Sequence, residues 1–345
     1  MNKNEISNKR VLVTGGAGFI GTNLCKDLIE KDNQVICLDN FSTGYKKNIE
    51  NLLSHKNFTL IEGDIRDIEV CNLAVENVDY VLHHAALGSV PRSINDPLTT
   101  NSVNIEGFLN MLIASRDKGI KRFVYAASSS TYGDSVELPK IEHRIGRPLS
   151  PYAITKYVNE LYAKVFTDLY GIETIGLRYF NVFGEFQSPK GAYAAVIPLW
   201  VQKLLQNEQP VINGDGSFSR DFTYIKNVIH ANHIAATTPG NKIFERAKYY
   251  NMNLSGKDKI SLVFNIAYGA NTTLLELFHA LRNNLSKYDS EIGNINPKFG
   301  PERPGDIPHS QASVLKASRI LGYSPQYDAF NGFAQACEWY YHNLK

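Results

Sequence analysis

The residues best suited to chemistry are a tyrosine, a lysine and a run of serines in the middle of the chain. Tyr152 and Lys156 lie four residues apart in the segment YAITK, so on a helix they would share one face, about one turn from each other. A phenol, with an ordinary pKa of about 10, is a poor base at neutral pH, but a nearby ammonium group favours its ionised form. A serine hydroxyl, which Ser128 can supply, can share the proton. Although the YxxxK spacing also occurs by chance, the trio predicts removal of a proton from an alcohol whose carbon gives up a hydride.

A short apolar run, a glycine-rich turn and a helical pattern follow one another near the N-terminus. Residues 10–14 form the run, the turn carries Gly15, Gly18 and Gly21, and apolar residues recur at helical spacing in 22–30. In a dinucleotide site the first glycine permits a tight turn, the second lets the backbone approach a pyrophosphate, and the third lets helix and strand pack closely. The order of these elements predicts such a site more strongly than the glycines alone.

An acidic residue ends the second predicted strand. Residues 34–38 have the pattern of a strand, and Asp39 follows, eighteen residues after Gly21. A carboxylate at this place can accept hydrogen bonds from both ribose hydroxyls and would repel a 2′-phosphate. We therefore expect NAD, not NADP, as the cofactor.

Strand and helix patterns continue to alternate up to about residue 180. Further strands are predicted at 58–61, 78–82, 122–126 and 174–178, and helices at 101–116 and from 152 to about 170. Asp64 follows the first of these strands, where it would face the adenine amino group or, like Asp67, cap a helix. This alternation predicts an α/β fold with a Rossmann-type doubly wound parallel sheet.

The fourth predicted strand is followed by His83, His84, Ala85 and Ala86. The two small alanines would let a flat ring or a ribose come close. We expect the histidines to be packed or exposed side chains and predict no metal site, because no third metal-binding side chain stands at a useful spacing. Asn104 interrupts the apolar face of the helix predicted at 101–116, and would be either a solvated residue or a hydrogen-bonding handle beneath the active site.

The character of the chain changes beyond residue 180. We expect residues 1–180 to form the NAD-binding domain and 181–345 mainly a smaller mixed α/β C-terminal substrate domain, with segments near 221–236 and 262–270 returning to the first domain. The second half carries helical patterns at 192–206 and 273–285 and strand patterns at 210–213, within 214–225 and at 264–267. Residues 239–261 are polar without clear periodicity, which predicts a poorly ordered surface excursion.

Composition excludes several classes of protein. Of 345 residues, 43% are apolar and 20% charged, and the formal net charge is only +2, which gives no indication of nucleic-acid binding. No apolar run of 18 residues and no signal-peptide pattern occur, so we expect a cytoplasmic protein without membrane contact. The cysteines have neither metal-site nor disulfide spacing and are Cys25, Cys37, Cys71 and Cys337.

The chain resembles the extended short-chain dehydrogenase/reductase enzymes that modify nucleotide sugars. The resemblance spans roughly residues 9 to 340 and rests on motifs that occur in that family's order: TGGAGFIG, LDNFSTG, GDIRD, HHAA, SSSTYG, YAITK, RYFNVFG, SRDFTYI and RPGD. Residues 87–93, 192–198 and 306–310 are shared most closely with the bacterial branch that epimerises UDP-N-acetylglucosamine at C4.

The resemblance implies a role for each matching residue. Tyr152 would be the catalytic base, Lys156 would lower its pKa and hold the nicotinamide ribose, and Ser128 would bond to the sugar 4-hydroxyl. The implied NAD-binding residues are Gly15, Gly18, Phe19, Ile20, Gly21, Asp39, Asn40, Ser42, Gly44, Asp64, Ile65, Ala85, Ala86, Asn104, Tyr152 and Lys156. The implied substrate-binding residues are Ser89, Arg92, Ser128, Ser129, Asn181, Gln187, Ala195, Val196, Asn213, Arg220, Arg303, Asp306 and Ser310. Among the latter, Arg220 and Arg303 would grip the diphosphate with forked hydrogen bonds.

The resemblance also indicates which of the family's reactions this chain would catalyse. The family's 4,6-dehydratases carry an Asp-Glu pair just after the catalytic hydroxyl residue, and here Ser129 and Ser130 stand in those positions, so elimination of water is disfavoured. Ser310 stands where bacterial hexose epimerases carry a bulky tyrosine, which leaves room for an acetamido group.

We therefore expect reversible C4 epimerisation of UDP-N-acetylglucosamine and UDP-N-acetylgalactosamine, through a 4-keto intermediate, for surface polysaccharide precursors. A homodimer would form through the helices beginning near residues 101 and 152. One alternative is epimerisation of UDP-N-acetylglucosaminuronic acid, with Arg92 facing the carboxylate. Another is a non-catalytic NAD-binding sensor, for which the intact trio would serve no purpose.

Overall fold

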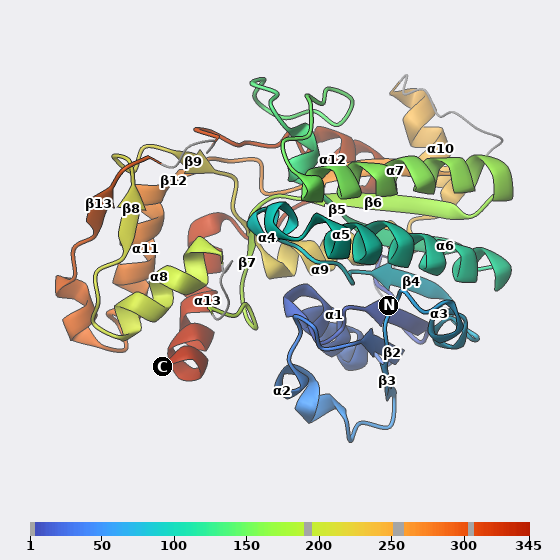
Figure 1. Cartoon of the computed structure of the whole chain (residues 1–345), viewed down its shortest axis with the longest axis horizontal. Helices are drawn as coiled ribbons and strands as arrows, with labels where there is room; N and C mark the ends of the chain where they lie inside the picture. The colour runs from blue at the N-terminus through green and yellow to red at the C-terminus, as the bar shows by residue number, and fades with distance from the viewer. Residues whose placement is uncertain (1–3, 190–194, 251–258, 303–306) are drawn as a thin grey trace.

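A sheet of parallel strands crosses the molecule (Figure 1). The structure is a computed structural model that describes residues 4–189, 195–250, 259–302 and 307–345. Seven strands form this sheet: β1 (Arg10–Thr14), β2 (Gln34–Asp39), β3 (Phe58–Glu62), β4 (Tyr80–His83), β5 (Arg122–Ser128), β6 (Glu173–Tyr179) and β11 (Ser261–Ile266). Their order is β11-β6-β5-β4-β1-β2-β3, and all neighbours are parallel.

The strand order reverses between β1 and β4. From β1 the chain builds the sheet outward to β3, then returns to β4 and builds in the other direction. At such a reversal the loops leave the two strands on opposite faces, so a crevice opens at their carboxyl ends, where ligands of doubly wound sheets bind. The predicted fold class, a Rossmann-type doubly wound parallel sheet, is confirmed.

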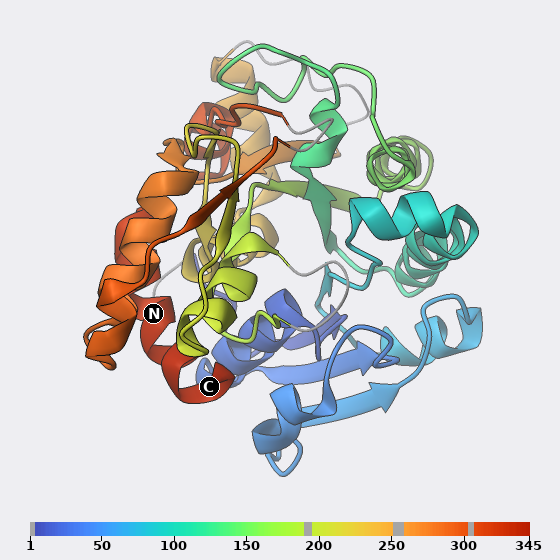
Figure 2. The same cartoon turned by 60° about the vertical axis from the view of Figure 1, so that its left-hand side comes forward.

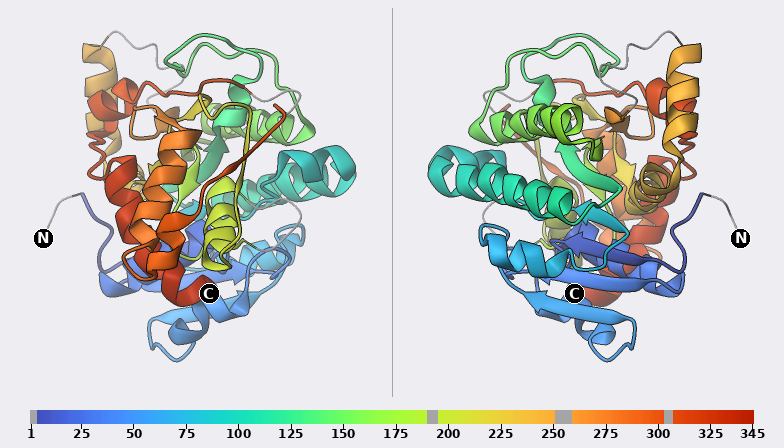
Figure 3. Two further views of the ribbon diagram at one scale, coloured as in Figure 1. Left: turned by 90° about the vertical axis from the view of Figure 1, so that its left-hand side faces the viewer. Right: turned by 90° about the vertical axis from the view of Figure 1, so that its right-hand side faces the viewer.

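Helices cover both faces of the sheet, which is why central strands such as β1 and β5 are apolar between their end residues. One face carries α3 (Ile68–Ala74), α6 (Gly107–Asp117) and α7 (Pro151–Tyr170), whose buried residues form one core with β4 and β5. The other face carries α1 (Phe19–Glu30), α9 (Ile225–Thr237) and α12 (Leu315–Leu321), which belong to a second and larger core. Figure 3 shows the two helical layers on opposite sides of the strands.

The single helix predicted at 101–116 is divided in the structure. It consists of α5 (Pro97–Asn101), a π-helical segment at Ser102–Glu106 and then α6. Asn104 lies in the π-helical segment, is buried, and bonds through its side chain to both the N–H and the carbonyl of Leu87. Of the two predicted roles for Asn104, the hydrogen-bonding handle is the one that the structure shows.

A second lobe is built mainly from the C-terminal half. Figure 2 shows its last helices, in orange and red, on the opposite side of the molecule from α4 (Val90–Asn95), α5, α6 and α7, in cyan and green. It contains α8 (Val196–Leu205), α11 (Leu274–Leu285) and α13 (Ala329–Leu344), with the strand pairs β8 (Val211–Asn213) with β13 (Lys298–Gly300), and β9 (Ser219–Arg220) with β12 (Thr272–Thr273). The chain reaches this lobe through β7 (Val182–Phe183), which pairs with β10 (Thr223–Tyr224). The boundary at residue 180 stays a prediction.

The expectation of a poorly ordered excursion at 239–261 is wrong for its first half. Residues Gly240–Tyr249 form α10, because Ile243 and Ala247, one turn apart, are both buried against neighbouring elements. Two buried positions in such a polar segment give too weak a periodic signal to predict a helix. Residues 251–258 lie outside the described part of the chain.

Asp221, between β9 and β10, ties three segments of the chain together. Its buried carboxylate accepts hydrogen bonds from the N–H groups of Tyr268 at 3.2 Å, Gly269 at 3.1 Å and Ala312 at 3.0 Å. These donors belong to the turn after β11 and to the segment before α12. A single carboxylate therefore satisfies backbone groups that have no strand partner there.

We predict that Asp221→Ala lowers the free energy of unfolding by about 3 kcal/mol or more, because it leaves several buried N–H groups without an acceptor. Chemical denaturation would measure the change. Asp215→Ala is the matched control, since the Asp215 carboxylate accepts from the N–H of Ser217 in an exposed turn, and its effect should stay below about 1 kcal/mol. Equal losses in the two variants would contradict the role assigned to Asp221.

Candidate active site

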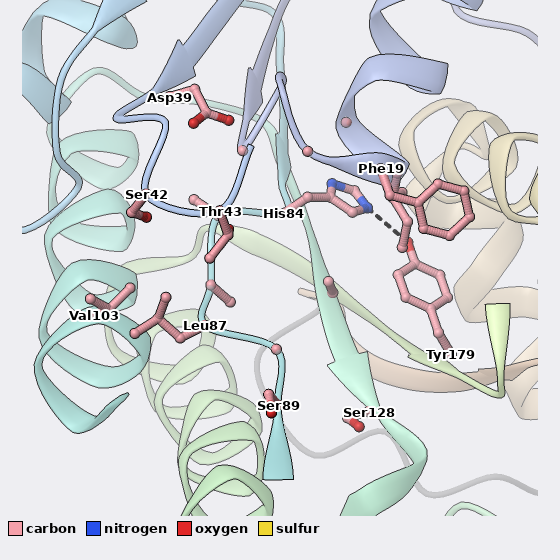
Figure 4. Close-up of a pocket in the computed structure, with 18 of the residues that line it drawn as sticks. Phe19, Asp39, Ser42, Thr43, His84, Leu87, Ser89, Val103, Ser128 and Tyr179 are labelled. Carbon is pink, nitrogen blue, oxygen red and sulfur yellow. Dashed lines mark hydrogen bonds between the residues drawn. The ribbon is translucent and has the colours of Figure 1, made fainter. Parts of the chain in front are cut away.

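A cavity of about 790 Å³ lies at the carboxyl edge of the sheet, between the strand-order reversal and the second lobe. The glycine-rich turn, the ends of β2, β4 and β5, the start of α7 and residues 179–188 all line it. Figure 4 shows Asp39 toward one end of this cavity and Ser128 toward the other. The cavity therefore offers an extended ligand two ends of different chemistry, a carboxylate and a hydroxyl.

The glycine-rich turn has no room for side chains at two of its positions. Gly15 has φ +68°, and a Cβ there would lie 2.8 Å from the backbone N of Ala85. A Cβ on Gly21 would overlap the carbonyl of Gly15, so the helix could not start so close to β1. Because α1 begins at Phe19 without a side-chain cap, its first N–H groups remain available to an anion. This cradle fits a pyrophosphate.

Asp39 shapes the next part of the cavity wall. One carboxylate oxygen accepts from the N–H of Ala17 at 2.9 Å, and the other accepts from the N–H of Phe41 at 2.8 Å. Burial raises the pKa of Asp39, and these two backbone hydrogen bonds oppose the rise. A carboxylate oxygen accepts more than one hydrogen bond, so ribose hydroxyls can still bind there. The cradle and Asp39 together fit an NAD molecule, and these residues would hold it.

Asp64 lies at the rim of the same end and is more constrained than the sequence indicated. Arg66 donates to it through Nε at 3.0 Å and through its terminal nitrogen at 2.6 Å, and Asn40 donates at 2.9 Å. Hydrogen bonds from Arg66 hold the pKa of Asp64 at about 2, so the carboxylate is ionised at neutral pH. Arg66 was not among the predicted residues, although its position two residues after an aspartate was a usable signal.

Most of the predicted NAD-binding residues line the cavity. These are Gly15, Gly18, Phe19, Ile20, Gly21, Asp39, Asn40, Ser42, Asp64, Ile65, Ala85, Ala86, Tyr152 and Lys156. The other two lie behind its wall. A Cβ on Gly44 would stand 2.9 Å from the backbone of Ala17, so Gly44 packs beneath the glycine-rich turn. Asn104 holds Leu87 and also donates to Thr155 of α7 at 3.1 Å.

The three predicted catalytic residues meet in this cavity because the end of β5 lies beside the start of α7. Ser128 is the last residue of β5. Ser150 caps α7 by accepting from the N–H of Ala153 at 3.1 Å, which places Tyr152 in the first helical turn. One turn later, the buried Lys156 ammonium donates to the carbonyl of Ala126 on β5 at 2.8 Å.

Burial sets the electrostatics of the trio. Burial raises the pKa of Tyr152, and hydrogen bonding by Ser128 acts in the opposite direction. Burial also lowers the pKa of Lys156 to about 8. In this structure the group that favours the Tyr152 phenolate is therefore Ser128, whereas the ammonium of Lys156 is directed to a backbone carbonyl.

Two residues that sequence reasoning did not assign to the site form a pair on its wall. His84, after β4, and Tyr179, at the end of β6, bond through Nε2 and the phenol oxygen at 2.9 Å, as the dashed line in Figure 4 shows. Asn232 of α9 donates to the same phenol oxygen at 2.9 Å. Burial lowers the pKa of His84 to about 4, so its imidazole is neutral at physiological pH. The pairing joins residues 95 positions apart, which no local pattern reveals.

The predicted substrate-binding residues fall into three groups. Those that line the cavity are Ser89, Arg92, Ser128, Ser129, Asn181, Gln187 and Ala195. Val196, Asn213, Arg220 and Ser310 are not among its described lining residues, and Arg303 and Asp306 lie outside the described residues. Arg220 donates to the carbonyl of Pro308 at 3.1 Å, and the N–H of Ser310 donates to Ser219 at 3.1 Å, so β9 runs beside the segment 308–310.

Three further properties concern the described residues alone. No three His, Cys, Asp or Glu side chains gather there in a way that could hold a metal ion. None of the helices in residues 4–189, 195–250, 259–302 and 307–345 is both long and apolar enough to cross a membrane. The cysteines are buried free thiols, namely Cys25, Cys37, Cys71 and Cys337.

We predict a pH-dependent difference in stability between NAD-free wild-type protein and Lys156→Met. Lys156 has a pKa of about 8 when folded and 10.5 ordinarily, so between these values the unfolded chain binds the extra proton. Wild-type stability should therefore rise between pH 8 and 10.5, by about 3 kcal/mol at most, and the variant should lack this rise. Denaturant unfolding across this range measures it.

Lys164→Met is the matched control, because Lys164 is an exposed residue of the same helix whose amine pairs with Asp168 at 3.0 Å. Its stability should follow the wild-type pH dependence. A rise of equal size in Lys156→Met and wild type would show that Lys156 keeps its ordinary pKa in the folded protein.

Comparison with known proteins agrees with this geometry. The model of the NAD dependent epimerase/dehydratase family matches residues 11–248. A UDP-N-acetylglucosamine 4-epimerase from Methanobrevibacter ruminantium, solved with UDP-N-acetylmuramic acid, is 37% identical with a TM-score of 0.84, over 97% of this chain and 99% of that one. A UDP-glucose 4-epimerase from Thermotoga maritima, solved with UDP-glucose, is 33% identical with a TM-score of 0.82, over 97% and 100% of the two chains.

A third similar structure is a UDP-glucuronic acid 4-epimerase from Bacillus cereus, solved with UDP-glucuronic acid and NAD. It is 27% identical, with a TM-score of 0.77, over 96% of this chain and 98% of that one. The family model covers well over half of the chain, and the fold and the dinucleotide cradle agree with it. The chain is therefore a member of the NAD-dependent epimerase/dehydratase family, an enzyme whose cofactor is NAD.

Proposed function

We propose that this protein is a UDP-N-acetylhexosamine 4-epimerase, which interconverts UDP-N-acetylglucosamine and UDP-N-acetylgalactosamine for surface polysaccharide precursors. The observation that carries the proposal is the meeting of Ser128, Tyr152 and Lys156 in one cavity with a dinucleotide cradle. A base, a hydroxyl donor and a redox cofactor are what epimerisation through a ketone requires.

The residues divide the chemistry among themselves. NAD, held by the glycine-rich turn and Asp39, would supply the acceptor and later the donor of the hydride at C4 of the sugar. Tyr152 takes the proton of the 4-hydroxyl, Ser128 bonds to the same oxygen, and Lys156 holds the nicotinamide ribose. The flat 4-keto sugar turns about its diphosphate linkage while the uridine diphosphate stays bound, so binding energy far from C4 keeps the intermediate in place.

The residues beside Ser128 support epimerisation over elimination of water. Ser129 and Ser130 begin a short 3₁₀ helix, Ser129–Tyr132, immediately after β5. A serine hydroxyl is too weak an acid to donate the proton that a leaving hydroxyl needs, so this stretch offers no general acid for a dehydratase. Hydride return to the same carbon then remains as the productive outcome.

Two features support an acetamido sugar as the substrate. Gln187 lines the cavity, its amide nitrogen donates to Val182, and its buried Oε1 has no partner among the described residues. That oxygen is covered in the structure, so it could accept from an acetamido N–H only after the amide turns toward the cavity, and satisfying it would then contribute to binding. Ser310, in the place of a bulky tyrosine, would leave the volume that the acetyl group needs. Ser129 and Asn181 are proposed to complete the amide contacts.

The remaining predicted residues are proposed to hold the uridine diphosphate. Arg220 and Arg303 would bond to its phosphates with charge-assisted hydrogen bonds. Ala195, Val196, Asn213 and Asp306 would complete that part of the site around the uridine. Ser89, whose hydroxyl accepts from the N–H of Arg92 at 3.2 Å and so caps α4 (Val90–Asn95), would lie along the opposite wall.

A second candidate substrate carries a carboxylate. Arg92 lines the cavity, and a guanidinium there suits the 6-carboxylate of UDP-N-acetylglucosaminuronic acid. A similar structure is that of a UDP-glucuronic acid 4-epimerase. We place this candidate second because its carboxylate is addressed by one residue, Arg92, whereas Gln187 and Ser310 would serve the acetamido group that both sugars share. A non-catalytic sensor comes third, since a pure NAD-binding protein has no use for Tyr152.

We also propose a homodimer in the cytoplasm. The outer face of α7 carries a stripe of exposed apolar residues, and Leu98 of the neighbouring α5 is 83% exposed. The stripe repeats at helical spacing and consists of Ile154, Leu161, Val165 and Leu169. Large apolar side chains at such spacing are typical of a helix that packs against another helix, so the same helices of a second copy would cover them.

We predict that Tyr152→Phe retains NAD and the fold but lowers kcat at least 100-fold, because the phenylalanine ring cannot take the proton of the 4-hydroxyl. Turnover of UDP-N-acetylglucosamine without added reductant, with NAD content measured in parallel, would check it. Tyr157→Phe on the same helix is the control and should keep wild-type turnover. Wild-type turnover in Tyr152→Phe would disprove the assignment of the base.

We predict that Ser310→Tyr suppresses UDP-N-acetylglucosamine turnover at least 10-fold more than UDP-glucose turnover, because the added ring would fill the acetamido volume. Parallel kcat/KM values on UDP-glucose, UDP-N-acetylglucosamine and its uronic acid would test both the pocket and the substrate. Ser290→Tyr, at an exposed serine, is the control. If Ser310→Tyr lowers kcat/KM for both neutral substrates equally, the volume argument fails. A wild-type preference for the uronic acid would favour the second candidate substrate.

A further inference from the structure

Ser128 and Ser130 make two hydrogen bonds to each other at the end of β5. The N–H of Ser130 donates to Ser128 Oγ at 3.1 Å, which is the capping bond of the 3₁₀ helix Ser129–Tyr132. The hydroxyl of Ser130 donates to the same oxygen at 2.9 Å. The first bond belongs to the backbone turn, whereas the second needs a hydroxyl side chain at position 130.

These two bonds use the whole accepting capacity of Ser128. A serine hydroxyl has one O–H donor and two acceptor lone pairs, and both lone pairs are occupied by Ser130. Ser128 can therefore act toward the cavity only as a donor. Its O–H is left to donate to an acceptor in the cavity, which Tyr152 also lines from the first turn of α7.

The turn that carries Ser130 is held firmly at its far end. Tyr132 is buried and donates from its hydroxyl to Asn265 of β11 at 2.6 Å, and the guanidinium of Arg178 lies 4.9 Å from the ring centroid of Tyr132. With β5 fixing one end and this contact the other, the backbone leaves the Ser130 hydroxyl directed at Ser128. The geometry is thus a property of the folded turn and does not require a ligand.

We propose that Ser130 is a positioning residue for the reaction, because its hydroxyl holds Ser128 as a donor aimed at Tyr152 and the reacting sugar oxygen. The part of this inference that concerns the sugar oxygen rests on the proposed function. The part that concerns the effect of Ser130 on Tyr152 does not. A hydroxyl that accepts a hydrogen bond becomes a better donor, so the chain Ser130–Ser128–Tyr152 stabilises the phenolate more than Ser128 alone. Ser130 itself does not line the cavity and need not touch the substrate.

Other ionisable groups around Tyr152 have to be considered in any test by pH. Around the cavity they are Lys156 on α7, Arg92 on α4, His84 after β4 and Tyr179 on β6, with Tyr45, Asp39 and Asp64 on the loops toward the other end. All of them are retained when only position 130 changes. These groups contribute equally in every variant at position 130. A difference in pH profile between such variants therefore reports the pair of Ser128 and Ser130.

The test compares Ser130→Ala, Ser130→Thr and wild type as NAD-bound enzymes. In Ser130→Ala the limb of the kcat/KM–pH profile that reports Tyr152 should move about 0.5 pH units upward, since the phenolate loses part of its stabilisation. Turnover below that limb should fall about three-fold or more. Ser130→Thr keeps a hydroxyl and should restore both values. Ser115→Ala, which removes a buried hydroxyl of α6 that has no hydrogen-bond partner among the described residues, is the control and should leave the profile unchanged.

A second readout does not depend on turnover. Ultraviolet difference titration of each variant against the same variant carrying Tyr152→Phe isolates the ionisation of Tyr152. Its midpoint should rise in Ser130→Ala and return in Ser130→Thr. An unchanged midpoint in Ser130→Ala, or equal shifts in the alanine and threonine variants, would overturn the proposal. If the wild type turns over no UDP-sugar while the titration still shows the shift, the proposed function fails and the positioning role stands.

Discussion

The site depends on how firmly the first turns of α7 are held against the end of β5. A buried ammonium, that of Lys156, donates to the carbonyl of Ala126, while Ser150 caps the helix at its first turn. From the other side, Asn104 bonds to Thr155. These three contacts act on neighbouring turns, so α7 can neither slide along nor rotate against β5 without breaking a buried polar bond. The separation between Ser128 and Tyr152 follows from that fit.

Burial has opposite effects on the members of this site. It raises the pKa of Tyr152 and lowers those of Lys156 and His84, because a low-dielectric surrounding disfavours every charged form. The protein by itself therefore keeps the base largely neutral. Stabilisation of the phenolate has to come from hydrogen bonds such as that of Ser128 and from charges that ligands bring. Such an arrangement suits an enzyme whose base acts only when the cavity is filled.

Buried polar side chains hold together the chain segments that surround the cavity. Asp221 gathers three backbone N–H groups from distant segments. Asn265 on β11 accepts from Tyr132 and donates to the carbonyls of Lys140 and Ser313. Each such group costs free energy unless all its partners are in place, so the arrangement specifies one relative position of the segments that surround the cavity. The cavity walls thereby hold their shape across chain segments far apart in sequence.

Local sequence determined the strands, the glycine-rich turn, Asp39 at the end of β2 and the one-turn spacing of Tyr152 and Lys156. These features arise within a few residues, where hydrophobic periodicity and backbone sterics act directly. The fold class followed from their order, and the reaction class from residues at known places in that order.

Only the tertiary structure decided the pairing of His84 with Tyr179, the attachment of Asn104 to Leu87 and the helix α10. The contacts of Arg66 with Asp64 and of Ser130 with Ser128 are local, since each joins residues two positions apart, but the sequence left the direction of these side chains open. Each of these depends on the direction in which a side chain leaves its element and on what lies opposite. Packing sets the direction of each side chain and the group that lies opposite it. Contacts between elements distant in sequence leave no periodic pattern in the chain.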